Sequence, residues 1–123
     1  MTTSEAIIIG ALKALGHPVS GDVPAERPQR FVTVERTGGK QTPYVDHGTF
    51  AVQAWADTRA KAGELAQTVA ANITMRLAKD NPNIARASVE SMYNFPDPDS
   101  ATPRYQITMT AIIKLSRKDT SNG

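Results

Sequence analysis

Two stretches of this chain of 123 residues alternate between apolar and polar positions. The longer one covers residues 105–115, and its apolar series is Tyr105, Ile107, Met109, Ala111, Ile113 and Leu115. The other covers residues 49–57, with the apolar series Phe50, Val52, Ala54 and Ala56. Successive side chains of a strand point to opposite faces, so both stretches are predicted to be strands with one buried face. Trp55 lies on the other face and is expected to pack against a neighbouring element or subunit.

Two further segments carry weaker strand patterns. Residues 30–36 alternate, with Phe31, Thr33 and Glu35 on one face and Val32 and Val34 on the other. The prolines at positions 24 and 28 suit an extended connector or an edge strand ahead of this segment. Residues 84–95 alternate well enough for another strand, which begins after the break at residues 81–83.

The first predicted helix covers residues 5–15 and stops at Gly16. Thr2 and Glu5 have the spacing of a capping box, and Ser4 is an alternative N-cap. The side chains expected to face the core are Ile8, Ala11, Leu12 and Leu15.

A longer helix is predicted from a cap at Asp57 or Thr58 to about Lys79. Its apolar stripe consists of Ala62, Leu65, Ala66, Val69, Ile73 and Leu77. A single stripe of this length is typical of a helix that packs across a sheet.

One isoleucine of the first helix does not fit the core face. Ile9 falls on the opposite side, in line with Glu5 and Lys13 at four-residue spacing. A lone subunit is therefore expected to leave Ile9 exposed, and we expect these three residues to form a contact between subunits. The alternative is an ordinary exposed isoleucine without a role.

The element order predicts the fold class. A helix, two or three strands, a long helix and two more strands are typical of an α+β domain. We expect residues 1–115 to form one domain, with a mostly antiparallel sheet of four to five strands and both helices on one face. Residues 116–123 are expected to be a disordered tail.

The segment RTGGKQTPYVDHG, residues 36–48, is rich in turn-forming residues. Its length predicts a mobile loop, with Arg36, Gly38, Gly39 and Lys40 as candidate contacts for a partner. A phosphate-binding loop would need a different glycine spacing and a following helix, and here a strand follows.

The segment NFPDPDSATPRYQ, residues 94–106, allows three interpretations: a metal loop, an acid/base pair or a stiff turn. Asp97 and Asp99 offer carboxylates, but calcium loops need more ligands and a glycine at the bend. Three prolines favour a rigid, exposed connection. Asp97, Asp99 and Arg104 then become candidates for contacts with partners.

Composition and charge narrow the function further. The absence of cysteine excludes disulfides, thiol catalysis and cysteine-based metal sites. The net charge of +2 comes from basic residues that are scattered along the chain, which is unlike a nucleic-acid binder. His17 and His47 lie in no catalytic motif, so we expect no enzyme, no metal and no cofactor. No secretory signal or membrane anchor is expected either.

Three blocks of the sequence together resemble the tail terminator proteins of long-tailed bacteriophages, particularly those that infect actinobacteria. The blocks are ERPQRFVTVERTGG, VQAWADTRAKAGELA and FPDPDSATPRYQITM. The resemblance implies a virion protein that forms a hexameric ring, caps the tail tube, stops its polymerisation and joins it to the head. The implied partners are other copies of the chain, the tail tube protein, a head completion or connector protein and the tape measure protein.

The resemblance also implies that DNA passes through the lumen of the ring without sequence-specific binding, and that there are no catalytic residues to transfer. In such a ring, Ile9 and Trp55 would be buried by neighbouring subunits. Other neck or tail-completion proteins remain an alternative. From different classes, a small ferredoxin-like enzyme with a site between subunits and a nucleic-acid-binding module also remain open.

Overall fold

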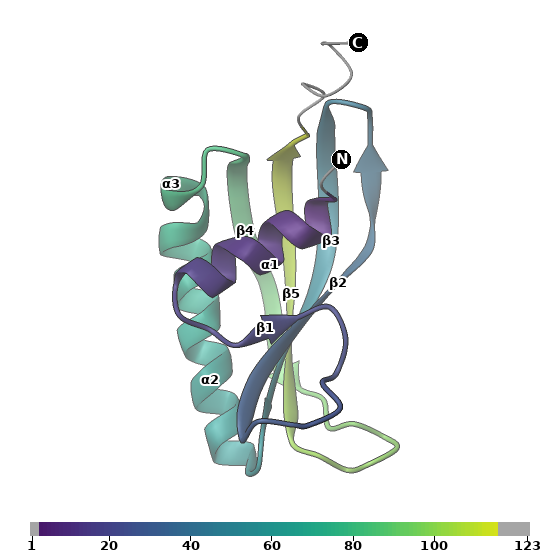
Figure 1. Cartoon of the computed structure of the whole chain (residues 1–123), viewed down its shortest axis with the longest axis vertical. Helices are drawn as coiled ribbons and strands as arrows, with labels where there is room; N and C mark the ends of the chain where they lie inside the picture. Colours follow the sequence, from purple (N-terminus) through teal and green to yellow (C-terminus); the bar gives the residue numbers. More distant parts are fainter. Residues whose placement is uncertain (1–2, 116–123) are drawn as a thin grey trace.

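The computed structural model describes residues 3–115 and contains one five-stranded sheet in the order β1-β2-β3-β5-β4. The strands are β1 (Val19–Ser20), β2 (Arg30–Gln41), β3 (Val45–Ala56), β4 (Ile84–Asn94) and β5 (Arg104–Lys114). All neighbouring strands are antiparallel except β1 and β2, which are parallel. Both long helices cover the same face of the sheet (Figure 1). The predicted α+β fold is confirmed, and the predicted tail lies outside the described residues.

The first helix is α1 (Ser4–Ala14), and its N-cap lies one residue away from each of the two predicted caps. Thr3 is the N-cap, and its hydroxyl accepts a hydrogen bond from the amide of Ala6 at 3.1 Å. Ser4 is buried inside the helix instead, so that prediction was wrong. The predicted stop is confirmed, because Gly16 adopts a φ of 95°, a left-handed conformation that suits glycine.

The second predicted helix is continuous through three segments: α2 (Arg59–Asn72), the π-helical turn η1 (Ile73–Leu77) and α3 (Ala78–Asp80). Thr58 caps it, with its hydroxyl accepting from the amide of Lys61 at 3.2 Å. All six residues of the predicted stripe are buried. None of the described helices is long and apolar enough to cross a membrane.

The core lies between the helices and the sheet. The two alternating strands supply its largest sheet residues, with Phe50, Val52, Ile107 and Met109 all fully buried. Fully burying a side chain of this size contributes about 1.5 to 3 kcal/mol, so the central strands β3 and β5 anchor the fold. The predicted alternation is confirmed for β5, whereas β3 is buried on both faces, because Ala51 and Trp55 are covered as well.

The predicted mobile loop at residues 36–48 is wrong, because the segment forms a β-hairpin. Strands β2 and β3 pair as far as Gln41 and Asp46, and only residues 42–44 turn. A β-bulge between Arg36 and Gly38 absorbs an extra residue. Gly39 has a φ of 111°, and a Cβ there would lie 2.1 Å from the carbonyl oxygen of His47. Glycine at position 39 therefore allows β2 and β3 to pair closely, although the sequence suggested that it formed part of a turn.

Candidate subunit interface

The two histidines do not share a site. His17 follows α1, and its Nε2 lies 2.8 Å from the side-chain amide nitrogen of Asn72 on α2. Burial lowers the pKa of His17, which favours a neutral ring that accepts this hydrogen bond. His47 is exposed on β3, opposite Lys40. Within residues 3–115, no group of three or more histidine and acidic side chains is placed to hold a metal ion.

The half of the hairpin nearest its turn contains an ion pair whose acidic partner is buried. Asp46 is fully buried, and its carboxylate accepts hydrogen bonds from Arg36 Nε at 2.9 Å and Nη2 at 2.8 Å. Burial by itself would raise the pKa of Asp46, but the hydrogen bonds and charge of Arg36 outweigh it and hold the pKa below its ordinary value. The buried Ser4 hydroxyl also lowers this pKa, but by less than Arg36 does.

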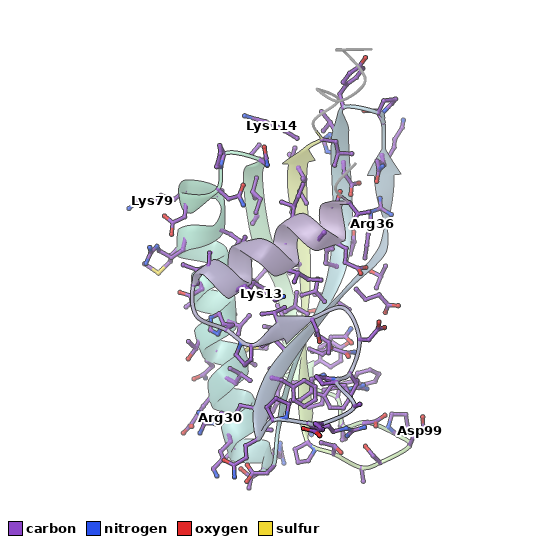
Figure 2. The ribbon with its side chains drawn as sticks, viewed as in Figure 1. Lys13, Arg30, Arg36, Lys79, Asp99 and Lys114 are labelled. Atoms are coloured by element: carbon purple, nitrogen blue, oxygen red, sulfur yellow. The ribbon has the colours of Figure 1, made fainter. Side chains whose placement is uncertain are left out.

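Glu5 ties the first turn of α1 to this hairpin. Its Oε2 accepts a hydrogen bond from the backbone amide of Arg36 at 3.0 Å. Figure 2 shows Arg36 beside the start of α1. The carboxylate of Glu5 is therefore engaged within the subunit, at the outer edge of β2, and does not form part of a capping box.

The row of Glu5, Ile9 and Lys13 is not an open surface. Ile9 is half-buried and packs against the hydrophobic core, and its Cδ1 lies 3.8 Å from the position that a Cβ of Gly21 would take. The connector that follows β1 folds back over the helix, which the helical pattern alone could not reveal. The expectation that a lone subunit exposes Ile9 is therefore wrong, and only Lys13 of the row is exposed.

Trp55 is also covered within its own subunit. Its ring stacks on Phe31 with centroids 5.3 Å apart, and its Nε1 donates to the hydroxyl of Thr33 at 3.1 Å. The guanidinium groups of Arg104 and Arg27 lie 4.9 Å and 5.6 Å from the ring centroid. With 3% of its surface exposed, Trp55 packs against a neighbouring element of its own chain, as one of the two expected arrangements has it, and it leaves little surface for a neighbouring subunit to bury.

The loop between β4 and β5 holds Arg104 in place. Arg104 is buried, donates from Nε to the carbonyl of Phe95 at 2.8 Å and lies 4.7 Å from the Phe95 ring. Asp97 accepts from the hydroxyl of Ser100, which lowers the pKa of Asp97. Asp99 is exposed near the lower end of the view in Figure 2, away from Arg36. The predicted exposed connection is confirmed, and one hydrogen bond, from Arg27 Nη1 to the hydroxyl of Thr102 at 3.3 Å, joins it to the connector before β2.

Beside the Phe31–Trp55 stack, the face of the sheet opposite the helices carries polar side chains that are joined by hydrogen bonds. Thr33 donates to Gln53 at 3.3 Å, Gln53 donates to Gln106 at 3.0 Å, and Gln106 donates to the hydroxyl of Tyr93 at 3.0 Å. This ladder crosses β2, β3, β5 and β4 in turn. It holds uncharged side chains in fixed positions on the face opposite the helices.

Strand β4 is an exposed sheet edge that the sequence pattern did not predict. Met92, Tyr93 and Phe95 expose 38%, 43% and 42% of their surfaces. The pairing of β4 with β5 shifts between Val89 and Ser91, and beyond that shift it is regular to the end of β4. No other strand of the described part of the chain pairs with its outer side. The uncharged run SMYNF was the available signal, because natural edge strands are usually blunted by charges.

The other edge of the sheet is mostly protected. Strand β1 pairs with Val32 and Thr33, and Glu5 occupies the amide of Arg36. Beyond these, Gly38, Gly39 and Lys40 are paired only with β3 as far as residues 3–115 show. Three of the predicted contact residues therefore lie together on the one stretch of β2 whose outer side stays open.

Comparison of the chain with protein-family models finds no family that matches, and no curated protein matches it.

Proposed function

We propose that this protein is a ring-forming structural subunit of the phage tail terminator type, which caps the tail tube and joins it to the head. The resemblance of three sequence blocks supports the phage assignment. The structural observation that carries the proposal is the pair of uncovered sheet edges, β4 on one side and the end of β2 on the other. Uncovered edges of this kind favour assembly with further chains.

The position of the two edges favours a ring over a symmetric dimer. They lie on opposite sides of one sheet, so each subunit can use different surfaces toward its two neighbours. Such heterologous contacts generate closed rings when the rotation between neighbours closes. A hexamer is the ring that the sequence resemblance implies.

The ends of the sheet supply the proposed surfaces for partners above and below the ring. The β2–β3 hairpin and the β4–β5 loop lie at opposite ends of the strands (Figure 1). One end would meet the tail tube protein and the other a head completion or connector protein. The tape measure protein and the passing DNA would meet the lumen.

A small enzyme with a site between subunits is the second candidate. The observation that favours it is a hollow of about 380 Å³ on the open face of the sheet, lined in part by His47, Arg86, Ser88 and Glu90. An adjoining subunit would have to complete such a site.

Imaging of the purified protein tests the proposal. Negative-stain microscopy and light-scattering mass should show rings, and addition of rings to polymerising tail tube subunits should shorten the tubes. A protein that stays monomeric both alone and with tube subunits would contradict the proposed function.

A further inference from the structure

The two open edges of the sheet suggest how neighbouring subunits join. We propose that residues Glu90–Tyr93 of β4 in one copy pair antiparallel with residues Gly38–Gln41 of β2 in the next copy. This inference rests on the proposed ring and names the contact that would build it. The occupant of the β4 edge is thus a second copy of this chain.

The strand directions permit this pairing. Because β2, β3, β5 and β4 are each antiparallel to the next, β4 runs opposite to β2. Rotation about an axis along the strands therefore places β4 of one copy antiparallel to β2 of its neighbour. The sheet would continue from one subunit into the next.

Charge repulsion excludes the register in which two neighbouring subunits lie at the same height along the strands. Within the sheet, Lys40 is level with Arg86, and Glu35 is level with Ser91, next to Glu90. A level neighbour would therefore bring lysine to arginine and glutamate to glutamate, which is unfavourable. Sliding the neighbour along the strands until Lys40 faces Ser91 removes both conflicts and brings Lys40 to Glu90.

The faces of the sheet agree with this staggered register. Lys40 lies opposite His47, and His47 and Glu90 line the same hollow of the open face. Neither Lys40 nor Glu90 has an ion-pair partner within the described chain. A pair between them would satisfy both charges on the same side of the extended sheet. A shift of each subunit along its neighbour's strand is compatible with a closed ring only if the strands are tilted relative to the ring axis, as they are in closed barrels.

The same register places large side chains opposite glycines. With Lys40 facing Ser91, Met92 lies opposite Gly39 and Tyr93 lies opposite Gly38. A Cβ at Gly38 would have no described atom within 4 Å, and its φ is not in the left-handed region, so the subunit itself does not require glycine there. The space beside Gly38 is available to an aromatic ring from a neighbour.

Cysteine cross-linking tests the register in a chain that has no cysteine of its own. The variant Lys40→Cys/Ser91→Cys should form disulfides between subunits under mild oxidation, giving a ladder of covalent oligomers in a denaturing gel. The matched control Lys40→Cys/Arg86→Cys reports the level register and should give no ladder. Three strand spacings separate these positions within one subunit, so a bond inside the chain is excluded.

Charge reversal provides a second measurement without oxidation. Lys40→Glu and Glu90→Lys should each raise the concentration needed for half-assembly by about tenfold, and the double reversal should restore most of the loss. Equal assembly of all variants would contradict the ion pair.

The outcomes separate the contact from the function. Rings without the Lys40→Cys/Ser91→Cys ladder, or with a ladder only in the control, would overturn the inferred contact and leave the ring proposal standing. A ladder in particles that remain open filaments would support the contact and overturn the ring. Monomers without any ladder would overturn both.

Discussion

At the scale of single residues, the most constrained polar group is the Asp46 carboxylate. It is fully buried and its charge is balanced by Arg36, whose side chain is 26% exposed. Removing one partner of a buried pair leaves the other charge without compensation. Since Arg36 retains some contact with water, the loss will be smaller than for a pair that is buried on both sides.

We therefore expect Asp46→Asn to lower the free energy of unfolding by about 2 to 3 kcal/mol, measured by urea denaturation. The control is Asp57→Asn, which removes an exposed ion pair with Lys61 and should cost less than about 1 kcal/mol. Equal losses in the two variants would show that burial adds nothing to the Asp46 interaction.

The same residue predicts a pH dependence. The folded-state pKa of Asp46 is lowered, so its contribution to stability is present above the unfolded pKa and is lost as pH falls through the folded pKa. The stability gap between wild type and Asp46→Asn should therefore be largest near neutral pH and shrink below about pH 4. A gap that stays constant from pH 7 to pH 2 would contradict this linkage.

At the scale of secondary structure elements, the β2–β3 hairpin contains a matched pair of glycines. Gly39 has a positive φ and a Cβ position in contact with a carbonyl oxygen, whereas Gly38 has open space. Gly39→Ala should destabilise the protein by about 2 kcal/mol or more, and Gly38→Ala by less than about 1 kcal/mol. Thermal unfolding of both variants measures the difference. Similar melting temperatures would show that the bulged hairpin yields to a Cβ at either position.

The elements also show how far the sequence determines the structure. Two kinds of pattern follow burial directly: the apolar series around Phe50 and Ile107, and the stripe from Ala62 to Leu77. These strands, the helix and the fold class were therefore predictable. The hairpin was not, because glycine next to threonine is compatible with both a turn and a bulged strand. Its pairing depends on the opposite strand, at Gly48.

The candidate site was only partly predictable, for a related reason. Ile9 was expected to be exposed in a lone subunit, and Trp55 was expected to pack against a neighbouring element or subunit. Each is covered by other segments of the same chain, including Gly21 and Arg104. The β4 edge carries the exposed apolar side chains instead, and strand order alone places it there. Strand order is a tertiary property that no single segment of the sequence encodes.

At the scale of the whole molecule, one layer of helices shields one face of the sheet (Figure 1). Strand β4 and residues Gly38–Lys40 of β2 are the parts of the two edges that stay open among the described residues. The exposed hydrophobic residues are not spread evenly over this architecture. Met92, Tyr93 and Phe95 cluster at the β4 edge, whereas Met75 is exposed alone on the π-helical turn. If exposure alone drove association, Met75 would matter most, because 70% of its surface is exposed.

This contrast gives a prediction with an internal control. Met92→Lys places a charge on the edge strand, which is a natural means of preventing edge pairing, and should shift the light-scattering mass from ring to monomer. Met75→Lys makes the same chemical change on the helical layer and should leave the ring intact. Both variants should unfold within about 1 kcal/mol of wild type, because both side chains are partly or largely exposed. Loss of assembly only in Met75→Lys would instead place the subunit contact on the helical layer, and the open β4 edge would then have to be explained by another partner.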